Sequence, residues 1–172
     1  MTKIAEAAPR LTPAADGQAF RDAMARLASP THIVTTAGQN GRAGLTATAV
    51  ASVSDAPPTV LVCIEGNSRT LAAIAANGVF CINTLPGGSA DLAETFAGRR
   101  GIEGEARFAS ARWGRLASGA PVLEQALAAF DCRLIAIREV ATHRIVIGEV
   151  LALGGTGQGA GLIYRERRFE TV

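Results

Sequence analysis

The residues with the clearest potential for binding chemistry are the small hydroxyls of residues 44–58, which we call the hydroxyl stretch. If this stretch forms one strand, alternate side chains point to opposite faces. One face then carries side chains spaced roughly 6–7 Å apart, namely Thr46, Thr48, Val50, Ser52 and Ser54. Small residues let a flat ligand approach the backbone, and hydroxyls can bond a polar ring edge or a phosphate. The solvent face of an ordinary strand rich in Thr and Ser shows the same pattern, so both interpretations stay open.

Residues for acid–base, hydrolytic or metal chemistry are scarce. The chain holds two histidines, His32 and His143, and three cysteines, Cys63, Cys81 and Cys132. It has no CxxC pair, no histidine at metal-ligand spacing, and no GxSxG, HExxH or phosphate-loop motif. Each cysteine lies within an apolar run, which favours buried free thiols. We therefore expect neither a metal site nor a hydrolytic triad.

A glycine-rich segment near the C-terminus, Gly155–Ala160, matches the dinucleotide fingerprint GxGxxG/A. That motif requires a helix after it and an acidic residue about 20 residues further on. Here a strand-like segment follows and the chain ends at Val172, so we interpret the segment as a hairpin loop. The nearby basic cluster is typical of a solvated strand end, although it could also face a phosphate-bearing ligand. It consists of Arg165, Arg167 and Arg168.

Length and composition fit a single globular domain. The chain has 172 residues, of which 48% are hydrophobic, and this is enough for a substantial core. The net charge of +2 is small and scattered, and only 5% of the residues are aromatic, so we expect no nucleic-acid partner. No apolar run reaches the roughly 20 residues of a membrane helix, and residues 1–10 lack the order of a secretory signal. We therefore expect a cytoplasmic protein without a membrane segment.

Changes in the spacing of apolar residues along the chain predict the helices and strands that must position the candidate binding residues. Residues 1–16 show no sustained period and are predicted to form a loose arm, followed by one domain over 17–172. Helices are predicted over 20–27, from the Ser68 cap to Asn77, over 90–96 and over 122–129. Strands are predicted over 31–36, 44–54, 59–64, 79–85, 130–139, 143–153 and 162–169. Many strands without strict βα alternation predict a mainly β fold: an antiparallel barrel, closed or nearly so, with flanking helices.

Several short motifs follow one another in a specific order. They are Gly41–Gly44, Val53–Pro58, Leu61–Ile64, Asn67–Ser68, Cys81–Leu85, Phe96–Gly98, Thr142–His143 and Gly161–Tyr164. In this order the chain resembles the short-chain flavin reductases that serve two-component monooxygenases, from about residue 20 to residue 169. Within that family it is most similar to the reductases of 4-hydroxyphenylacetate oxygenation and of pyrimidine utilisation.

The resemblance implies a fold, cofactors and partners. The fold would be the split β-barrel of FMN-binding flavin reductases, assembled as a homodimer. FMN or FAD would bind in a groove near the dimer interface, NADH or NADPH would reduce it, and reduced flavin would pass to a separate oxygenase component. Because the groove would be small and lined by hydroxyls, we expect flavin to behave as a substrate as much as a prosthetic group.

The resemblance also implies three groups of flavin contacts. The edge of the isoalloxazine would lie along the hydroxyl stretch, against Thr46, Ala47, Thr48 and Ala49. The ribityl chain and phosphate would lie near Ser52, Ser68 and Thr70, with Asn67 orienting the turn and Arg69 adding charge. The end of helix 90–96 would contribute Phe96, Ala97 and Gly98, with Arg99 as a candidate phosphate partner.

For the reductant, the resemblance places His143 beside the nicotinamide and Tyr164 near the pyridine nucleotide. His143 would hold the carboxamide or the pyrophosphate, because the hydride chemistry belongs to the cofactors. A structural histidine on a strand is the competing interpretation, and Ala141 stands where the family often has glycine. Two other functions stay open: a flavin-bound oxidase of the pyridoxamine-phosphate-oxidase type, and a flavin-binding module without turnover.

Overall fold

The computed structural model describes residues 15–39 and 41–172. The predicted arm falls almost entirely outside the described residues. In chain order the elements are α1 (Gly17–Met24), β1 (Ser29–Pro30), β2 (His32–Gly38), β3 (Gly41–Ala47), β4 (Val50–Asp55), β5 (Pro58–Glu65), α2 (Arg69–Asn77), β6 (Val79–Thr84), α3 (Ala90–Phe96), the 3-10 helix η1 (Gly104–Ser110), β7 (Trp113–Arg115), β8 (Pro121–Leu123), β9 (Ala128–Val140), β10 (His143–Gly154), β11 (Leu162–Arg165) and β12 (Arg168–Thr171). Among the described residues, no helix is long and apolar enough to span a membrane.

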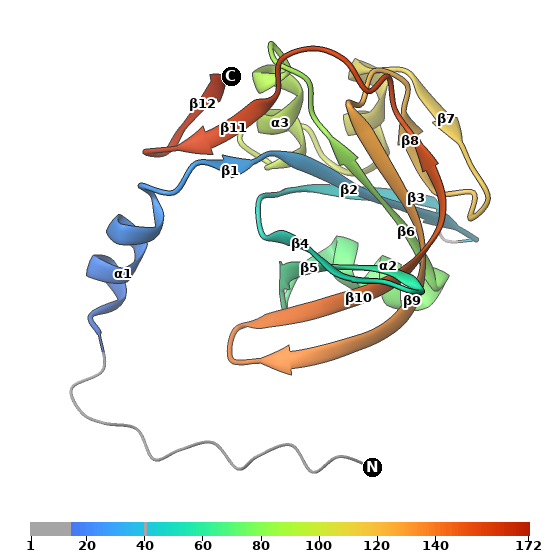
Figure 1. Ribbon diagram of the computed structural model, residues 1–172, viewed down its shortest axis with the longest axis horizontal. Coiled ribbons are helices and arrows are strands. Elements are labelled where there is room, and N and C mark those ends of the chain that lie inside the picture. The colour runs from blue at the N-terminus through green and yellow to red at the C-terminus, as the bar shows by residue number, and fades with distance from the viewer. Residues whose placement is uncertain (1–14, 40) are drawn as a thin grey trace.

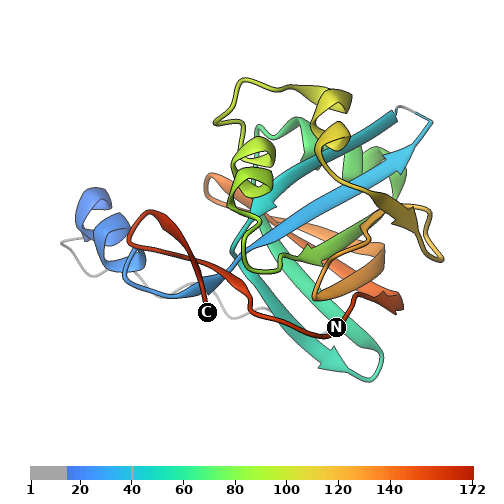
Figure 2. The same ribbon diagram turned by 90° about the horizontal axis from the view of Figure 1, so that it is seen from above.

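A curled antiparallel sheet of seven strands forms the body of the molecule (Figures 1 and 2). Its strand order is β3-β2-β6-β9-β10-β5-β4, so its two edge strands, β3 and β4, follow each other directly in the chain. In the described part of the chain no ladder joins β3 to β4. The chain itself bridges the two edges at Thr48 and Ala49, and we call this break in the ladder the seam.

The seam corrects the prediction of one continuous strand over 44–54. β3 pairs with β2, whereas β4 pairs with β5, so the chain must change partners between Ala47 and Val50. A register shift between Ser52 and Ser54 bends β4 further. The side chains of the hydroxyl stretch therefore do not share one face of a single strand. Its first half borders β2, and its second half runs along β5.

Apolar side chains pack on both faces of the sheet. One cluster lies under α2 and includes Val34, Val62 and Phe80, and the other lies under α3 and η1 and includes Ile33 and Phe96. Ile33 and Val34 are consecutive residues of β2, so alternation sends one side chain into each cluster. Each buried side chain of this size contributes about 1.5–3 kcal/mol to folding. β2 therefore ties the two halves of the core together.

Local signals placed α2 and α3 correctly. Ser68 caps α2, since its Oγ accepts from the Leu71 N–H at 3.4 Å. Gly78 ends the helix in the left-handed region at φ +70°, where glycine carries no steric cost. α3 ends at Phe96, whose ring packs 5.2 Å from that of Phe108. These two helices lie next to the seam.

Two other elements differ from the sequence prediction. The predicted helix over 122–129 is wrong, because this segment forms β8 and the start of β9. The Leu123 N–H donates to the buried Asn83 Oδ1 at 2.8 Å, and such a non-local bond is invisible to periodicity. The single strand over 162–169 is also wrong, because the chain turns back at Glu166 and Arg167 to form β11 and β12. Gly155–Ala160 is a loop between β10 and β11, as predicted, but it is not a hairpin loop, because β10 belongs to the seven-stranded sheet and β11 to the three-stranded one.

Burial of His32 in β2 makes stability depend on pH. His32 is 7% exposed, and desolvation lowers its pKa from 6.5 to about 4. Between these two values the unfolded chain binds more protons, so stability falls as the pH is lowered through this window and is retained above it. We expect the free energy of unfolding to fall by about 2 kcal/mol from pH 7.5 to pH 5 through this residue alone.

Urea unfolding of the wild type and of His32→Gln across that range measures the effect. The variant should lose less stability on acidification than the wild type, by about the same 2 kcal/mol. Parallel pH profiles for the two proteins would show that another group carries the dependence.

Candidate functional site

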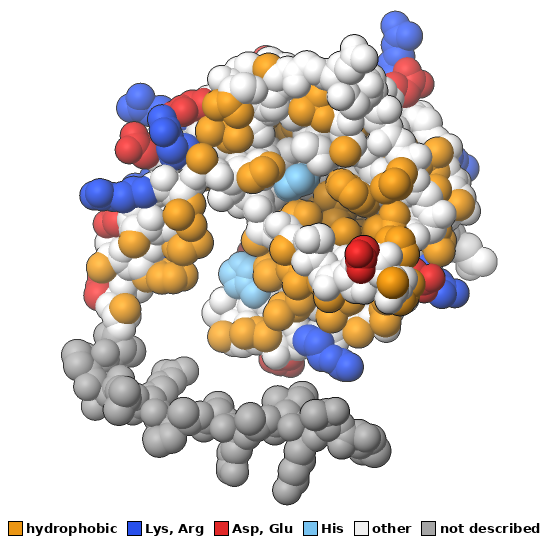
Figure 3. Space-filling view, viewed as in Figure 1, with side chains coloured by type: hydrophobic (Ala, Val, Ile, Leu, Met, Phe, Trp, Pro, Cys, Tyr) orange, Lys and Arg blue, Asp and Glu red, His pale blue; other side chains and the backbone are white. Residues whose placement is uncertain are grey.

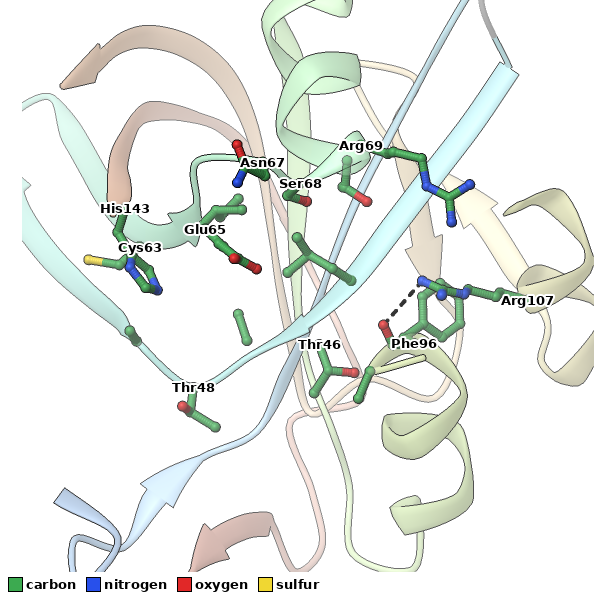
Figure 4. Close-up of a pocket in the computed structure, with 16 residues that line it drawn as sticks. Thr46, Thr48, Cys63, Glu65, Asn67, Ser68, Arg69, Phe96, Arg107 and His143 are labelled. Atoms are coloured by element: carbon green, nitrogen blue, oxygen red, sulfur yellow. Dashed lines mark hydrogen bonds between the residues drawn. The ribbon is translucent and has the colours of Figure 1, made fainter. Parts of the chain in front are cut away.

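A cavity of about 570 Å³ opens along the seam, beside the start of α2 and the end of α3 (Figure 4). This volume lies within the range of about 300–1,000 Å³ that is common for small-molecule sites. Its walls contain ten of the fourteen predicted site residues, namely Thr46, Ala47, Thr48, Ala49, Asn67, Ser68, Thr70, Phe96, Ala97 and His143. Segments that are far apart in the sequence therefore meet in one place.

The seam supplies unpaired backbone groups to the cavity wall. In the described part of the chain, the N–H groups of Thr48 and Ala49 donate to no backbone or side-chain acceptor. The carbonyl of Ala49 accepts from the Cys63 N–H at 2.9 Å, which fixes the chain where it crosses from β3 to β4. An edge with free N–H donors suits a planar ring that has polar acceptor atoms along its rim. The donor set therefore fits a flavin ring.

The hydroxyls of the cavity are not equivalent. Thr46 Oγ1 donates to the Ala93 carbonyl of α3 at 2.6 Å, so Thr46 offers a ligand only acceptor capacity. Ser68 Oγ already caps α2. Thr70 is 6% exposed and lines the cavity, and within the described residues its hydroxyl makes no hydrogen bond to the protein. This hydroxyl can therefore bond a ligand as donor or acceptor.

His143 begins β10 at the opposite end of the cavity from the arginines (Figure 4). Its Cα pairs with that of Glu65 across the ladder to β5. Its Nδ1 lies 2.9 Å from Thr142 Oγ1, and this contact leaves Nε2 free of protein partners among the described residues. An exposed imidazole with one nitrogen anchored can hold a polar group of a ligand with the other.

Sequence reasoning gave no site role to five residues that line this cavity, namely Leu45, Cys63, Ile64, Glu65 and Arg107. Cys63 and Glu65 are consecutive cavity-facing positions of β5, and the alternation of that strand could have indicated them. Arg107 lies in η1, a segment without helical or strand period, and no local signal distinguishes it from other arginines.

Arg99 and Tyr164 lie beside the main cavity rather than in it. They line a second cavity of about 170 Å³ whose walls include Thr46, Thr48 and Ala97, and these three residues also line the first. Arg99 Nη2 donates to Tyr164 Oη at 3.0 Å. A third cavity, of about 620 Å³, lies against α1 and shares Thr48 and Tyr164. Thr48 therefore borders all three neighbouring cavities, which we together call the groove.

Two predicted residues are not brought to this groove. Ser52 lies beyond the seam on β4 and lines a separate cavity with Val60 and Leu153. Because β4 pairs with β5, its residues leave the site soon after Ala49. Gly98 follows α3 with φ +77° and donates to the Thr95 carbonyl at 3.2 Å, and it lines none of the three cavities.

Thiol reactivity offers a test of the cavity. Cys81 and Cys132 are buried, and desolvation raises the pKa of both thiols, that of Cys132 to about 12. Cys63 is half-buried and lines the cavity. Because the thiolate is the reactive species, we expect a disulfide reagent to label Cys63 first in the native protein. Labelling at equal rates at all three positions would contradict this assignment of burial.

Occupation of the cavity should protect Cys63. Saturating FMN is expected to slow its labelling, and Cys63→Ser serves as the control that loses the fast phase. An unchanged rate with FMN bound would place the ligand away from β5.

Comparison with known proteins gives concordant matches. The family model described as "Flavin reductase like domain" matches residues 24–172. FMN reductase (NADH) RutF 1 of Methylorubrum extorquens is 49% identical over 157 residues, covering 91% of this chain and 77% of the relative.

Solved structures agree with the sequence matches. A crystal structure assigned as a flavin reductase from Haemophilus somnus has a TM-score of 0.88 and 41% identity, covering 92% of this chain and all of the other. BorF, the flavin reductase component of a bacterial two-component tryptophan halogenase, has a TM-score of 0.84 and 27% identity, covering 91% and 98% of the two chains.

Proposed function

The chain belongs to the flavin reductase like domain family, and on that premise we propose that it passes a hydride from NADH to FMN and releases the reduced flavin to a separate oxygenase component. The observation that carries the proposal is the main cavity at the seam, whose wall holds the unpaired amides of Thr48 and Ala49 together with the exposed His143. A relative that is 49% identical is named FMN reductase (NADH), and a structural neighbour is the reductase component of a two-component enzyme.

The residues of the cavity bind and orient. When bound, the flavin supplies the hydride acceptor and the nicotinamide supplies the hydride. The amides of Thr48 and Ala49 would hold the polar rim of the flavin ring, with Ala47 and Thr46 beneath it. Ser68 and Thr70 would lie along the ribityl chain, with Asn67 shaping the turn before them. Holding two rings in contact removes several kcal/mol of the entropic barrier, so positioning is the main contribution of the protein.

The outer part of the groove suits the pyridine nucleotide. Thr48 leads from the main cavity to Tyr164 and Arg99, whose guanidinium lies 5.5 Å from the Tyr164 ring centre. We propose that His143 orients the nicotinamide and that Arg99 and Tyr164 contact the remainder of NADH. Phe96, Ala97 and Gly98 would close the groove on the α3 side. Ser52 lies outside this groove, so we do not include it among the flavin contacts of its own chain.

Exposed apolar side chains support a homodimer. Figure 3 shows such side chains over the region of β4 and β10 and along α1. Val53, Leu151 and Leu153 are 52%, 43% and 69% exposed. α1 has no buried residue, and an isolated helix of eight residues is marginal in water. We propose that a second copy covers these surfaces and that the seam is the opening of a split barrel; sedimentation equilibrium should then give twice the chain mass.

The loss of NADH absorbance, measured with and without added FMN, FAD or riboflavin, tests the proposed function. Turnover that depends on added flavin supports a reductase with diffusible flavin. Bound flavin without NADH oxidation would favour the binding module instead. Tightly bound flavin that is reduced only by a substrate other than NADH would favour the oxidase.

A further inference from the structure

The wall of the main cavity carries the carboxylate of Glu65. Among the described residues that line this cavity, Glu65 is the only acid. Figure 4 shows its carboxylate pointing into the cavity, towards the seam. The proposed function places the polar rim of the flavin ring at the seam, on the amides of Thr48 and Ala49. A negative charge therefore faces the place where the ring would bind.

The backbone of Glu65 is fixed, but its carboxylate has no partner in the protein. Its Cα pairs with that of His143 at the end of the β5–β10 ladder, and its carbonyl accepts from the Ser68 N–H at 3.0 Å. In the part of the chain that the structure describes, the carboxylate makes no ion pair and accepts no hydrogen bond. Arg144, the residue after His143, pairs with Glu139 at 3.1 Å instead. The charge of Glu65 therefore acts on whatever occupies the cavity.

Hydride transfer changes the charge of a flavin ring. A hydride carries two electrons and one proton, so the neutral oxidised ring becomes an anion when it accepts one, and the nicotinamide that gave it becomes a cation. Only a further proton from the solvent neutralises the anion. Like charges repel more strongly in a protein cavity than in bulk water, because the effective dielectric constant is lower. A carboxylate on the wall therefore acts strongly on the reduced ring and weakly on the neutral oxidised ring.

We propose that Glu65 makes the cavity discriminate between the two oxidation states of flavin, because its charge weakens the binding of the anionic reduced ring. The inference rests on the proposed function and adds to it the residue that favours release of the product. Arg69 and Arg107 do not cancel this effect by pairing with Glu65, since Figure 4 shows both guanidinium groups on the far side of the cavity. Weaker binding of the reduced form also lowers the midpoint potential of the bound flavin, by thermodynamic linkage.

Equilibrium binding tests this inference without NADH and without turnover. Dissociation constants for the wild type and Glu65→Gln are measured by anaerobic ultrafiltration in mildly alkaline buffer, with oxidised FMN and with FMN reduced by dithionite. We expect Glu65→Gln to bind reduced FMN about 10-fold more tightly than the wild type does, as for two charges roughly 10 Å apart at an effective dielectric constant of about 20. Binding of oxidised FMN should change little. The midpoint potential of bound FMN should rise by about 30 mV, which is the same factor for two electrons.

Glu149→Gln is the matched control. The Cα of Glu149 pairs with that of Thr59 at the other end of the same β5–β10 ladder, and its side chain does not line the cavity. This variant loses the same charge away from the site, so the ratio of the two dissociation constants should stay that of the wild type.

Glu65→Ala separates loss of the charge from gain of an amide. It should tighten the binding of reduced FMN as Glu65→Gln does. Tighter binding in Glu65→Gln alone would show that a new hydrogen bond is responsible, and this would overturn the proposal.

Two further outcomes would overturn the inference. An equal change in both dissociation constants of Glu65→Gln would make Glu65 a residue that shapes the cavity, and unchanged constants for both forms would remove its influence on flavin. Failure of the proposed function is distinguishable, because the wild type would then oxidise no NADH with any added flavin. Failure of this inference alone leaves that activity intact, with the same ratio of dissociation constants in the wild type and Glu65→Gln.

Discussion

His143→Ala is expected to lower kcat/KM for NADH by about 10- to 100-fold while leaving the affinity for flavin nearly unchanged. The expected size corresponds to one hydrogen bond to a charged or strongly polar group. The imidazole is anchored through Nδ1 to Thr142, so Nε2 is presented to the ligand in a fixed direction. Stopped-flow reduction of flavin by NADH separates the hydride step from binding.

Two further variants sharpen this test. Thr142→Val removes the anchor of the ring but keeps the imidazole, so a smaller loss is expected than in His143→Ala. Cys63→Ser changes a neighbour of His143 on the cavity wall and should leave hydride transfer close to that of the wild type. Stopped-flow traces from His143→Ala that match the wild type would remove His143 from the site and make it a structural residue of β10.

Gly44→Val is expected to destabilise the fold by about 3 kcal/mol and to weaken flavin binding with it. A Cβ at Gly44 would lie 2.7 Å from Phe96 Cε1 and 3.2 Å from the Val34 carbonyl oxygen. Phe96 is 1% exposed and packs against Phe108 and Trp113, so its ring has no free space to move into. Displacement of Phe96 would shift the end of α3 and thereby the wall of the cavity.

Gly114→Val is the matched control, since a Cβ at this β7 position meets no atom within 4 Å. It should change the midpoint of urea unfolding little. Gly44→Ala and Phe96→Leu, measured singly and together, complete the test, because the smaller side chain at 96 should relieve part of the cost at 44. Additive losses would show that the two residues do not compete for the same space.

Helices and strands could be predicted from the sequence where the residues that determine them lie within the element itself. α2 carries its own signals in Ser68 and Gly78, and both were found in the sequence. The long strands β9 and β10 were also expected, because a sustained apolar run needs no partner to be recognised. The helix predicted over 122–129 failed because the amide of Leu123 is bound by Asn83, a residue 40 positions away.

The candidate site was harder to predict, because it depends on contacts between segments that are far apart in the sequence. Nothing between Ala47 and Val50 marks the seam, since the change of partner from β2 to β5 is decided by pairing across the sheet. The residues around it were assigned through resemblance to a family rather than through spacing. Arg107 was missed for the same physical reason: besides the nearby Ile102 carbonyl, its position depends on the carbonyls of Phe96 and Gly44, which are 11 and 63 positions away.

The seam has a mechanical consequence. A barrel closed by a ladder can widen only by breaking hydrogen bonds, whereas here the two edges are linked by Thr48 and Ala49 alone. A change in the width of the cavity at the seam would therefore break no ladder bond between β3 and β4. The resistance to such a change would come instead from single contacts, such as the bond from the Cys63 N–H to the Ala49 carbonyl. If the cavity holds flavin as proposed, these contacts would decide how easily the wall adjusts between one ring and a stacked pair.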